Sequence, residues 1–177
     1  MAAYKEIVTK TIVGKGKKSF EKEYNLTTEE KPNTVLGCWI INHRFKGSNR
    51  KNEVKVNGSF DVNVWYSYDN DTKTTVSTKT FEYEELLRLR IKDYDALTND
   101  NEIIVRSLKQ PTVQNVKINN GEVNLSVSKE LGVEIVGESK VKIATLEEEM
   151  PWDDIYDEET PDIEVNEEYL ENDERVN

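Results

Sequence analysis

The chain has few of the side chains that build catalytic or metal sites. Its 177 residues include one cysteine, Cys38, and one histidine, His43. A single cysteine excludes a disulfide within one chain and a zinc site with several thiolate ligands. Neither a secretory signal nor a run of the ~18 to 20 apolar residues that a membrane span needs is visible. We therefore expect a protein that starts in the cytosol and spans no membrane.

The two rare side chains do not form an obvious catalytic pair. Cys38 and His43 are five positions apart, a spacing that along a strand places them on opposite faces and ~16 Å apart. Cys38 follows an apolar run and is expected to be a buried, inert thiol. His43 is expected to end a strand at the surface. We predict no catalytic residue, no cofactor and no metal site.

Positive charge is scarce at the C-terminal end. Residues 147–177 hold 15 Asp and Glu against one basic residue, Arg175, and so carry −14; residues 1–146 hold 20 acids and 23 bases and carry +3. Self-repulsion keeps such an acidic segment from collapsing. The sequence predicts two parts, a folded domain over residues 1–146 and a disordered acidic tail over residues 147–177. Net acidity argues against nucleic-acid binding.

Apolar residues recur within the acidic tail. Such residues, spaced through a disordered segment, are typical of short docking motifs that order on binding. The alternative is that they pack back on the body. The candidate partner-docking residues are Trp152, Ile155, Tyr156, Tyr169 and Leu170.

Alternation of apolar and polar residues indicates strands through most of residues 1–146. Residues 60–68 (FDVNVWYSY) place Phe60, Val62, Val64, Tyr66 and Tyr68 on one face. Residues 69–71 (DND) supply turn chemistry, and residues 72–84 form a return strand. Residues 119–121 (NNG) predict a second hairpin between strands over residues 113–118 and 122–128.

The remaining strands are predicted from shorter patterns. We expect a strand over residues 5–13 that ends at the glycines of residues 14–16. We expect another over residues 35–41 that is buried on both faces or passes through the core. Residues 84–90 permit a helical turn, but the period-two arginines favour a strand. Residues 133–143 close the body. About nine strands without long helices predict an all-β fold, an antiparallel β-sandwich or partly open barrel, whose edges offer unpaired peptide groups to a second copy.

Four segments make the chain familiar. They are residues 36–43 (LGCWIINH), 56–68 (VNGSFDVNVWYSY), 110–111 (QP) and 134–141 (EIVGESKV). Together they resemble the spore coat protein E family, the outer-coat morphogenetic proteins of endospore-forming bacteria, over nearly the whole chain. The resemblance implies a non-enzymatic scaffold that is made in the mother-cell cytoplasm and forms homo-oligomers or a layer. It also implies attachment to the inner coat platform of the spore morphogenetic ATPase, recruitment of outer coat proteins, and final location in the outer coat.

The sequence also permits a second interpretation, in which the chain has a different kind of function. Trp65, Tyr66 and Tyr68 are consecutive or nearly consecutive aromatics that suit a sugar-binding platform. In that case the chain is a monomeric carbohydrate-binding or carbohydrate-active β-sandwich. Alternating aromatics on a strand are more often core, so the two readings differ in where these three side chains lie.

Overall fold

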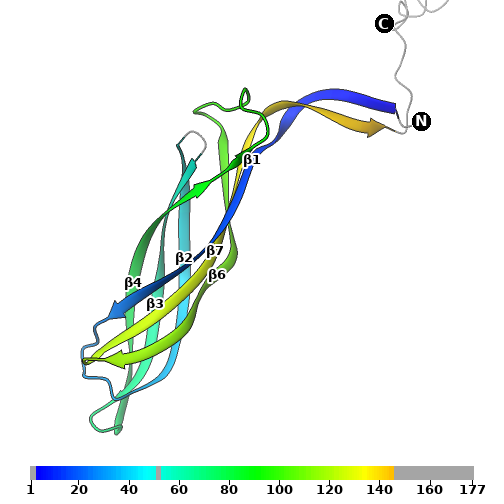
Figure 1. Ribbon diagram of the computed structural model, residues 1–177. Helices are drawn as coiled ribbons and strands as arrows, with labels where there is room; N and C mark the ends of the chain where they lie inside the picture. Colours follow the sequence, from blue (N-terminus) through cyan, green and yellow to red (C-terminus); the bar gives the residue numbers. More distant parts are fainter. Residues whose placement is uncertain (1–2, 51–52, 146–177) are drawn as a thin grey trace, which may run out of the picture. The chain divides into compact units, whose positions relative to one another are not determined.

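The computed structural model describes residues 3–50 and 53–145 (Figure 1). The chain divides into a unit from Glu6 to Ile143 and a unit that joins Met1–Lys5 with Ala144–Asn177. In the second unit, the Thr145 hydroxyl donates a hydrogen bond to the Ala3 carbonyl oxygen at 3.4 Å. The tail predicted over residues 147–177 lies outside the described residues. The first unit contains the core.

The described residues form strands and no helix, which confirms the all-β prediction. Residues 3–50 and 53–145 contain seven strands where about nine were expected, because two of them are each 24 residues long. The strands are β1 (Ala3–Leu26), β2 (Thr34–Arg50), β3 (Glu53–Tyr68), β4 (Lys73–Arg88), β5 (Arg90–Ile91), β6 (Glu102–Asn119) and β7 (Glu122–Thr145).

The strands form two antiparallel sheets that do not close into a barrel. One sheet has the order β5-β1-β7-β6 and the other the order β2-β3-β4. Both sheets contribute to one hydrophobic core, so they pack face to face as a sandwich. The fully buried side chains at its centre come from β1, β3, β4 and β7 and include Val13, Leu26, Phe60, Val62, Val64, Tyr66, Leu87, Leu125, Leu131 and Ile135.

Both predicted hairpins are present. The β3–β4 pair runs in unbroken register from Glu53 opposite Arg88 to Tyr68 opposite Lys73. The turn residues between them have positive φ, which Asp and Asn tolerate better than other non-glycine residues. In the β6–β7 turn, Asn120 and Gly121 have φ of 50° and 79°, as a tight Asn-Gly hairpin requires.

The prediction that the first strand ends at the glycines is wrong. β1 runs through Gly14 and Gly16 to Leu26. A Cβ atom on Gly14 would lie 2.7 Å from the Ile91 side chain, and one on Gly16 would lie 2.6 Å from the Arg88 carbonyl oxygen. The glycines therefore admit the close approach of the end of β4 and of β5, a role that local sequence does not reveal.

The prediction that residues 35–41 are buried on both faces is also wrong. β2 is an edge strand of the three-stranded sheet and extends to Arg50. Cys38 and Ile40 pack against the core, while Trp39 and Ile41 are exposed on the opposite face. The strand interpretation of residues 84–90 is correct up to Arg88, and the chain then crosses to the other sheet as β5.

Candidate interaction surfaces

The outer face of the three-stranded sheet carries a cluster of exposed apolar side chains. It lies where β2, β3 and β4 pair through Gly37, Trp65 and Val76. A contiguous apolar cluster on a protein surface is typical of a contact site. The members of this outer aromatic patch are 43% to 50% exposed and are Leu36, Trp39, Ile41, Trp65 and Val76.

Two tryptophan rings meet over a glycine at the centre of the patch. A Cβ atom built on Gly37 would lie 3.6 Å from the Trp39 ring and 3.7 Å from the Trp65 ring. The register of β2 and β3 shifts between Val35 and Gly37, as at a β-bulge, and leaves Leu36 without a partner residue on β3. Strands rather than a loop therefore present the patch.

The polar groups at the border of the patch form hydrogen bonds and an ion pair with one another. The Asp61 carboxylate accepts hydrogen bonds from Thr80 Oγ1 at 2.6 Å and Asn42 Nδ2 at 2.9 Å, and the Arg44 guanidinium lies 3.7 Å away. The Thr80 bond, and after it the Asn42 bond, lowers the pKa of Asp61. The carboxylate stays ionised at neutral pH and needs no ligand to balance it.

The structure separates the three aromatics of the predicted sugar platform. Trp65 belongs to the outer aromatic patch, whereas Tyr66 is 1% exposed and Tyr68 packs at the edge of the core. The Tyr66 and Tyr68 rings lie 6.3 Å apart on the inner side. No platform of these three side chains exists, because alternation along β3 sends Trp65 to the other face.

The interior of the sandwich contains an ion pair that the sequence analysis missed. Lys129 of β7 is 4% exposed, and its Nζ lies 2.9 Å from Glu85 Oε1 of β4. The same ammonium lies 4.1 Å from the centre of the Tyr83 ring and 5.1 Å from that of Phe20. A carboxylate and two aromatic faces thus replace the water that the buried charge has lost.

The polar chain continues from Tyr83 to β2 and β6. Tyr83 OH lies 2.7 Å from His43 Nε2, and His43 Nδ1 lies 3.1 Å from Gln110 Oε1. Desolvation first, then the charge of Lys129, lowers the pKa of His43, while the Gln110 bond opposes the shift. Burial raises the pKa of Tyr83 to about 12. His43 is therefore neutral, donating through Nδ1 to Gln110 and accepting through Nε2 from Tyr83.

The expectation that His43 ends a strand at the surface is wrong. The residue lies within β2, half-buried, at the register shift between Ile41 and Arg44. Both of its ring nitrogens are engaged, so neither is available to Cys38. Cys38 is half-buried on the core side, and burial raises the pKa of its thiol to about 11. A thiol with that pKa is a poor nucleophile at neutral pH.

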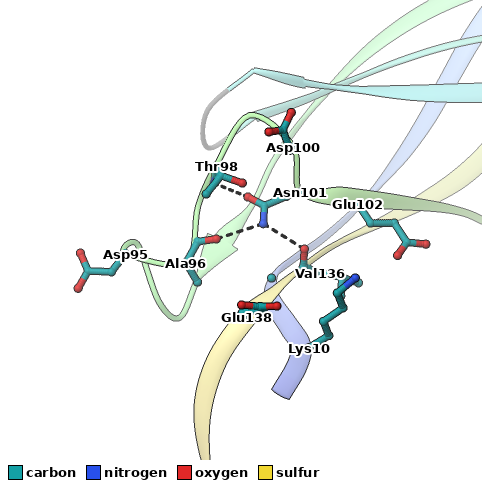
Figure 2. Close-up of a pocket in the computed structure, with 10 residues that line it drawn as sticks. Lys10, Asp95, Ala96, Thr98, Asp100, Asn101, Glu102, Val136 and Glu138 are labelled. Atoms are coloured by element: carbon teal, nitrogen blue, oxygen red, sulfur yellow. Dashed lines mark hydrogen bonds between the residues drawn. The ribbon is translucent and has the colours of Figure 1, made fainter. Parts of the chain in front are cut away.

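A cleft of about 450 Å³ lies where the loop between β5 and β6 crosses β7 (Figure 2). Asn101 ties the loop down, because its amide nitrogen donates to the carbonyls of Ala96 and Val136, both at 3.1 Å. Figure 2 shows the carboxylates of Asp95 and Glu102 pointing away from each other. The hydrogen bonds of Asn101 therefore hold the loop in place beside the cleft. The carboxylates of Asp95 and Glu102 do not converge on a common point in the cleft.

In the part of the chain that the structure describes, no group of three or more His, Cys, Asp or Glu side chains is arranged to hold a metal ion. No helix long and apolar enough to cross a membrane occurs there. The predicted docking residues of the tail (Trp152, Ile155, Tyr156, Tyr169 and Leu170) lie outside the described residues.

Among known protein families, a model described as outer spore coat protein E matches residues 3–175, nearly the whole chain. No curated protein and no solved structure gives a significant match. The matched range includes every strand of the sandwich and every residue of the outer aromatic patch.

Proposed function

We propose, since the chain belongs to the outer spore coat protein E family, that it is a non-enzymatic scaffold which builds the outer coat of the spore by self-association. The outer aromatic patch is the observation that carries this proposal. Two tryptophans fixed on a sheet face supply a large apolar contact area at little cost in side-chain entropy. The occupant of the patch is a second copy of the chain.

The composition of the outer face supports a protein contact. Trp39 and Trp65 form the centre, and hydrogen-bonded polar groups around Asp61 form a rim. An apolar centre with a polar rim is the usual anatomy of a protein–protein interface. A patch presented by paired strands also meets a partner without an ordering cost.

The acidic segment over residues 147–177 is proposed to do a different task. In an assembled layer many copies of this segment lie close together, so weak individual contacts gain avidity. Trp152 and Tyr156 are the proposed anchors, with Ile155, Tyr169 and Leu170 in support. Their partners are other outer coat proteins, while the assembled layer attaches to the inner coat platform of the morphogenetic ATPase. Synthesis in the mother-cell cytoplasm precedes both events.

Truncation separates the two tasks. A chain that ends at Leu146 is expected to self-associate like the full chain but to lose binding to outer coat proteins. The assay is light scattering for assembly, followed by pull-down of purified outer coat proteins by each form. A full chain with Trp152 and Tyr156 changed to Ala is the matched control and is expected to behave like the truncated chain. A monomeric truncated chain would contradict the division of tasks.

A further inference from the structure

The first part of β1 has an open edge. β5 lies on that side of β1 but pairs only with Gly14 and Lys15. The main-chain hydrogen bond beyond these pairs runs from Lys92 N to the Val13 carbonyl oxygen at 2.8 Å. Among the described strands, none covers this side of β1 before Val13. An uncovered strand edge offers its unpaired peptide groups to another strand.

The first part of β1 and the last part of β7 form a ribbon of only two strands. β6 pairs with β7 as far as Val136, and beyond that residue β1 is the one described strand beside β7. The loop between β5 and β6 reaches Ser139, whose hydroxyl donates to Asp93 Oδ2 at 2.6 Å. Glu6 and Lys140 form an ion pair at 3.8 Å along the ribbon. A ribbon of two strands is marginally stable in water, so a further strand would stabilise it.

The exposed face of β1 has a self-complementary pattern of side chains. Val8 is 68% exposed and lies at the centre of this pattern. Glu6 precedes it by two positions and Lys10 follows it by two, so all three side chains lie on one face of the strand. All three are exposed. The face therefore presents an acid, an apolar side chain and a base in one direction, and the reverse order in the other.

A second copy of β1 fits this pattern when the two strands are antiparallel about Val8. Val8 then lies opposite Val8, and Glu6 of each copy lies opposite Lys10 of the other. Cross-strand pairs of opposite charge are stabilising. A parallel pair in register would instead place Glu6 opposite Glu6 and Lys10 opposite Lys10, which is destabilising. Lysine on an edge normally disfavours strand addition, but in the antiparallel register Lys10 meets a carboxylate.

The existing contacts of the two charged residues leave room for this pairing. The Glu6 and Lys140 side chains are 52% and 75% exposed, so their ion pair lies in solvent and Glu6 can also meet a second cation. Lys10 borders the cleft beside the loop between β5 and β6, and it forms no ion pair with a described residue.

The peptide groups of β1 suit the same register. In an antiparallel strand, alternate residues direct their peptide groups to the same side. Because the Val13 carbonyl oxygen points toward β5, Ile7 and Thr9 direct theirs to the open edge, while Val8 faces β7. Pairing about Val8 lets Ile7 of each copy exchange both main-chain hydrogen bonds with Thr9 of the other. The two Val8 residues then form a non-hydrogen-bonded pair, in which side chains lie closest.

We propose that β1 of one copy pairs antiparallel with β1 of a second copy about Val8, joining the two ribbons into one sheet. This inference rests on the proposed function and names one interface of the assembly. The pairing is isologous and by itself closes at a dimer. The outer aromatic patch provides the second kind of contact that an extended layer needs.

Charge reversal in a Trp65→Ser chain tests the pairing. This chain lacks half of the tryptophan centre of the outer aromatic patch, so it is expected to stop at the β1 dimer. Glu6→Lys and Lys10→Glu each place like charges opposite one another. Each is expected to raise the dissociation constant of this dimer at least tenfold in sedimentation velocity. Both changes in one chain exchange the charges of each pair and are expected to restore the dimer.

Lys117→Glu is the matched control. Lys117 is exposed on β6, and its change to Glu gives the same net charge as Lys10→Glu. In the Trp65→Ser chain it is expected to leave the dimer unchanged. The β1 interface is overturned by a Trp65→Ser chain that is monomeric, by a Lys10→Glu variant that dimerises normally, or by a double variant that does not recover.

Hydrogen exchange of the native chain tests the interface without relying on variants. On association, exchange is expected to slow at the amides of Ile7 and Thr9 and to change less at Val8, whose amide faces β7. Protection of Ile7 and Thr9 that is complete at low concentration, and lost in a chain that ends at Leu146, would assign the edge to the chain's own acidic segment and overturn the proposal.

Failure of this interface is distinguishable from failure of the proposed function. Native chains that associate with no added protection at Ile7 and Thr9 contradict the β1 pairing and leave the scaffold proposal intact. Native chains that never associate contradict the scaffold proposal itself.

Discussion

Lys129 and Glu85 form an ion pair inside the sandwich, with Nζ and Oε1 2.9 Å apart and the lysine side chain 3% exposed. The pair joins the middle of β7 to β4 and so connects the two sheets. A buried charge with one good partner depends on that partner, because solvent cannot replace it.

Glu85→Gln is therefore expected to destabilise the fold strongly. Loss of the partner leaves Lys129 charged and buried, at a cost of about 3 kcal/mol in the free energy of unfolding. Urea unfolding followed by tryptophan fluorescence measures the effect. The double variant Lys129→Met with Glu85→Leu is expected to recover most of the loss, because neither charge remains. Equal stability of Glu85→Gln and the native chain would show that the pair is not closed to water.

Gly14 and Gly16 form a matched pair for testing why β1 needs glycine. Gly16→Ala directs its methyl group at the Arg88 carbonyl, which is backbone and cannot move alone. It is expected to cost about 1–3 kcal/mol of unfolding free energy. Gly14→Ala meets only the end of the Ile91 side chain, which can change rotamer, and is expected to cost less. Thermal unfolding of both variants measures their relative stability. A Gly14→Ala variant that is less stable than Gly16→Ala would contradict this explanation.

The neutral His43 predicts a dependence of stability on pH. Its pKa is lowered in the folded state, so below the ordinary value of about 6.5 the unfolded chain binds more protons. Stability is expected to be full above that pH and to fall as the pH drops through the folded pKa. The measurement is urea unfolding between about pH 7.5 and pH 5.5, a range in which carboxylates stay ionised. His43→Gln is expected to flatten the dependence of the unfolding free energy on pH. An unchanged dependence in this variant would show that another group causes it.

The outer aromatic patch predicts variants that fold but associate poorly. Trp39→Ser and Trp65→Ser remove side chains that are 43% exposed, so each is expected to change the unfolding free energy by about 1 kcal/mol or less. Self-association is expected to weaken at least tenfold. Tyr94→Ser, which removes an aromatic that is 68% exposed and outside the patch, is the control. Normal association of both tryptophan variants would exclude the patch as a self-contact.

Local patterns predicted the parts of the fold that depend on local chemistry. Alternation from Phe60 to Tyr66 predicted the core face of β3 correctly, and Asn120 with Gly121 predicted the hairpin between β6 and β7. The breaks at Gly14 and Gly16 were wrong because their role depends on Arg88 and Ile91, far away in sequence. Close approach between distant segments leaves no mark on the pattern beyond the glycine itself.

The interior ion pair could have been predicted from the pattern of residues in the sequence. Val127, Lys129 and Leu131 alternate with polar residues, so the lysine occupies a core position of β7. A strand prediction that stopped at Ser128 divided β7 at that point and hid the buried charge. Glu85 occupies the matching core position between Tyr83 and Leu87 of β4. A lysine and a glutamate in register with apolar neighbours are best explained by each other, since neither is commonly buried alone.

The outer aromatic patch was missed for a related reason. An apolar run such as residues 35–41 fits a strand buried on both faces as well as a strand with an apolar outer face. Only the placement of β2 at a sheet edge, with no layer on its outer side among the described residues, separates the two. The docking residues of the tail stay predictions from composition.

The mass of the full chain as a function of concentration tests the central claim most directly. Sedimentation velocity of the native protein, repeated at several salt concentrations and pH values, is expected to show dimers that grow into larger species as concentration rises. A single species of monomer mass, 20.5 kDa, under every condition would contradict the scaffold account.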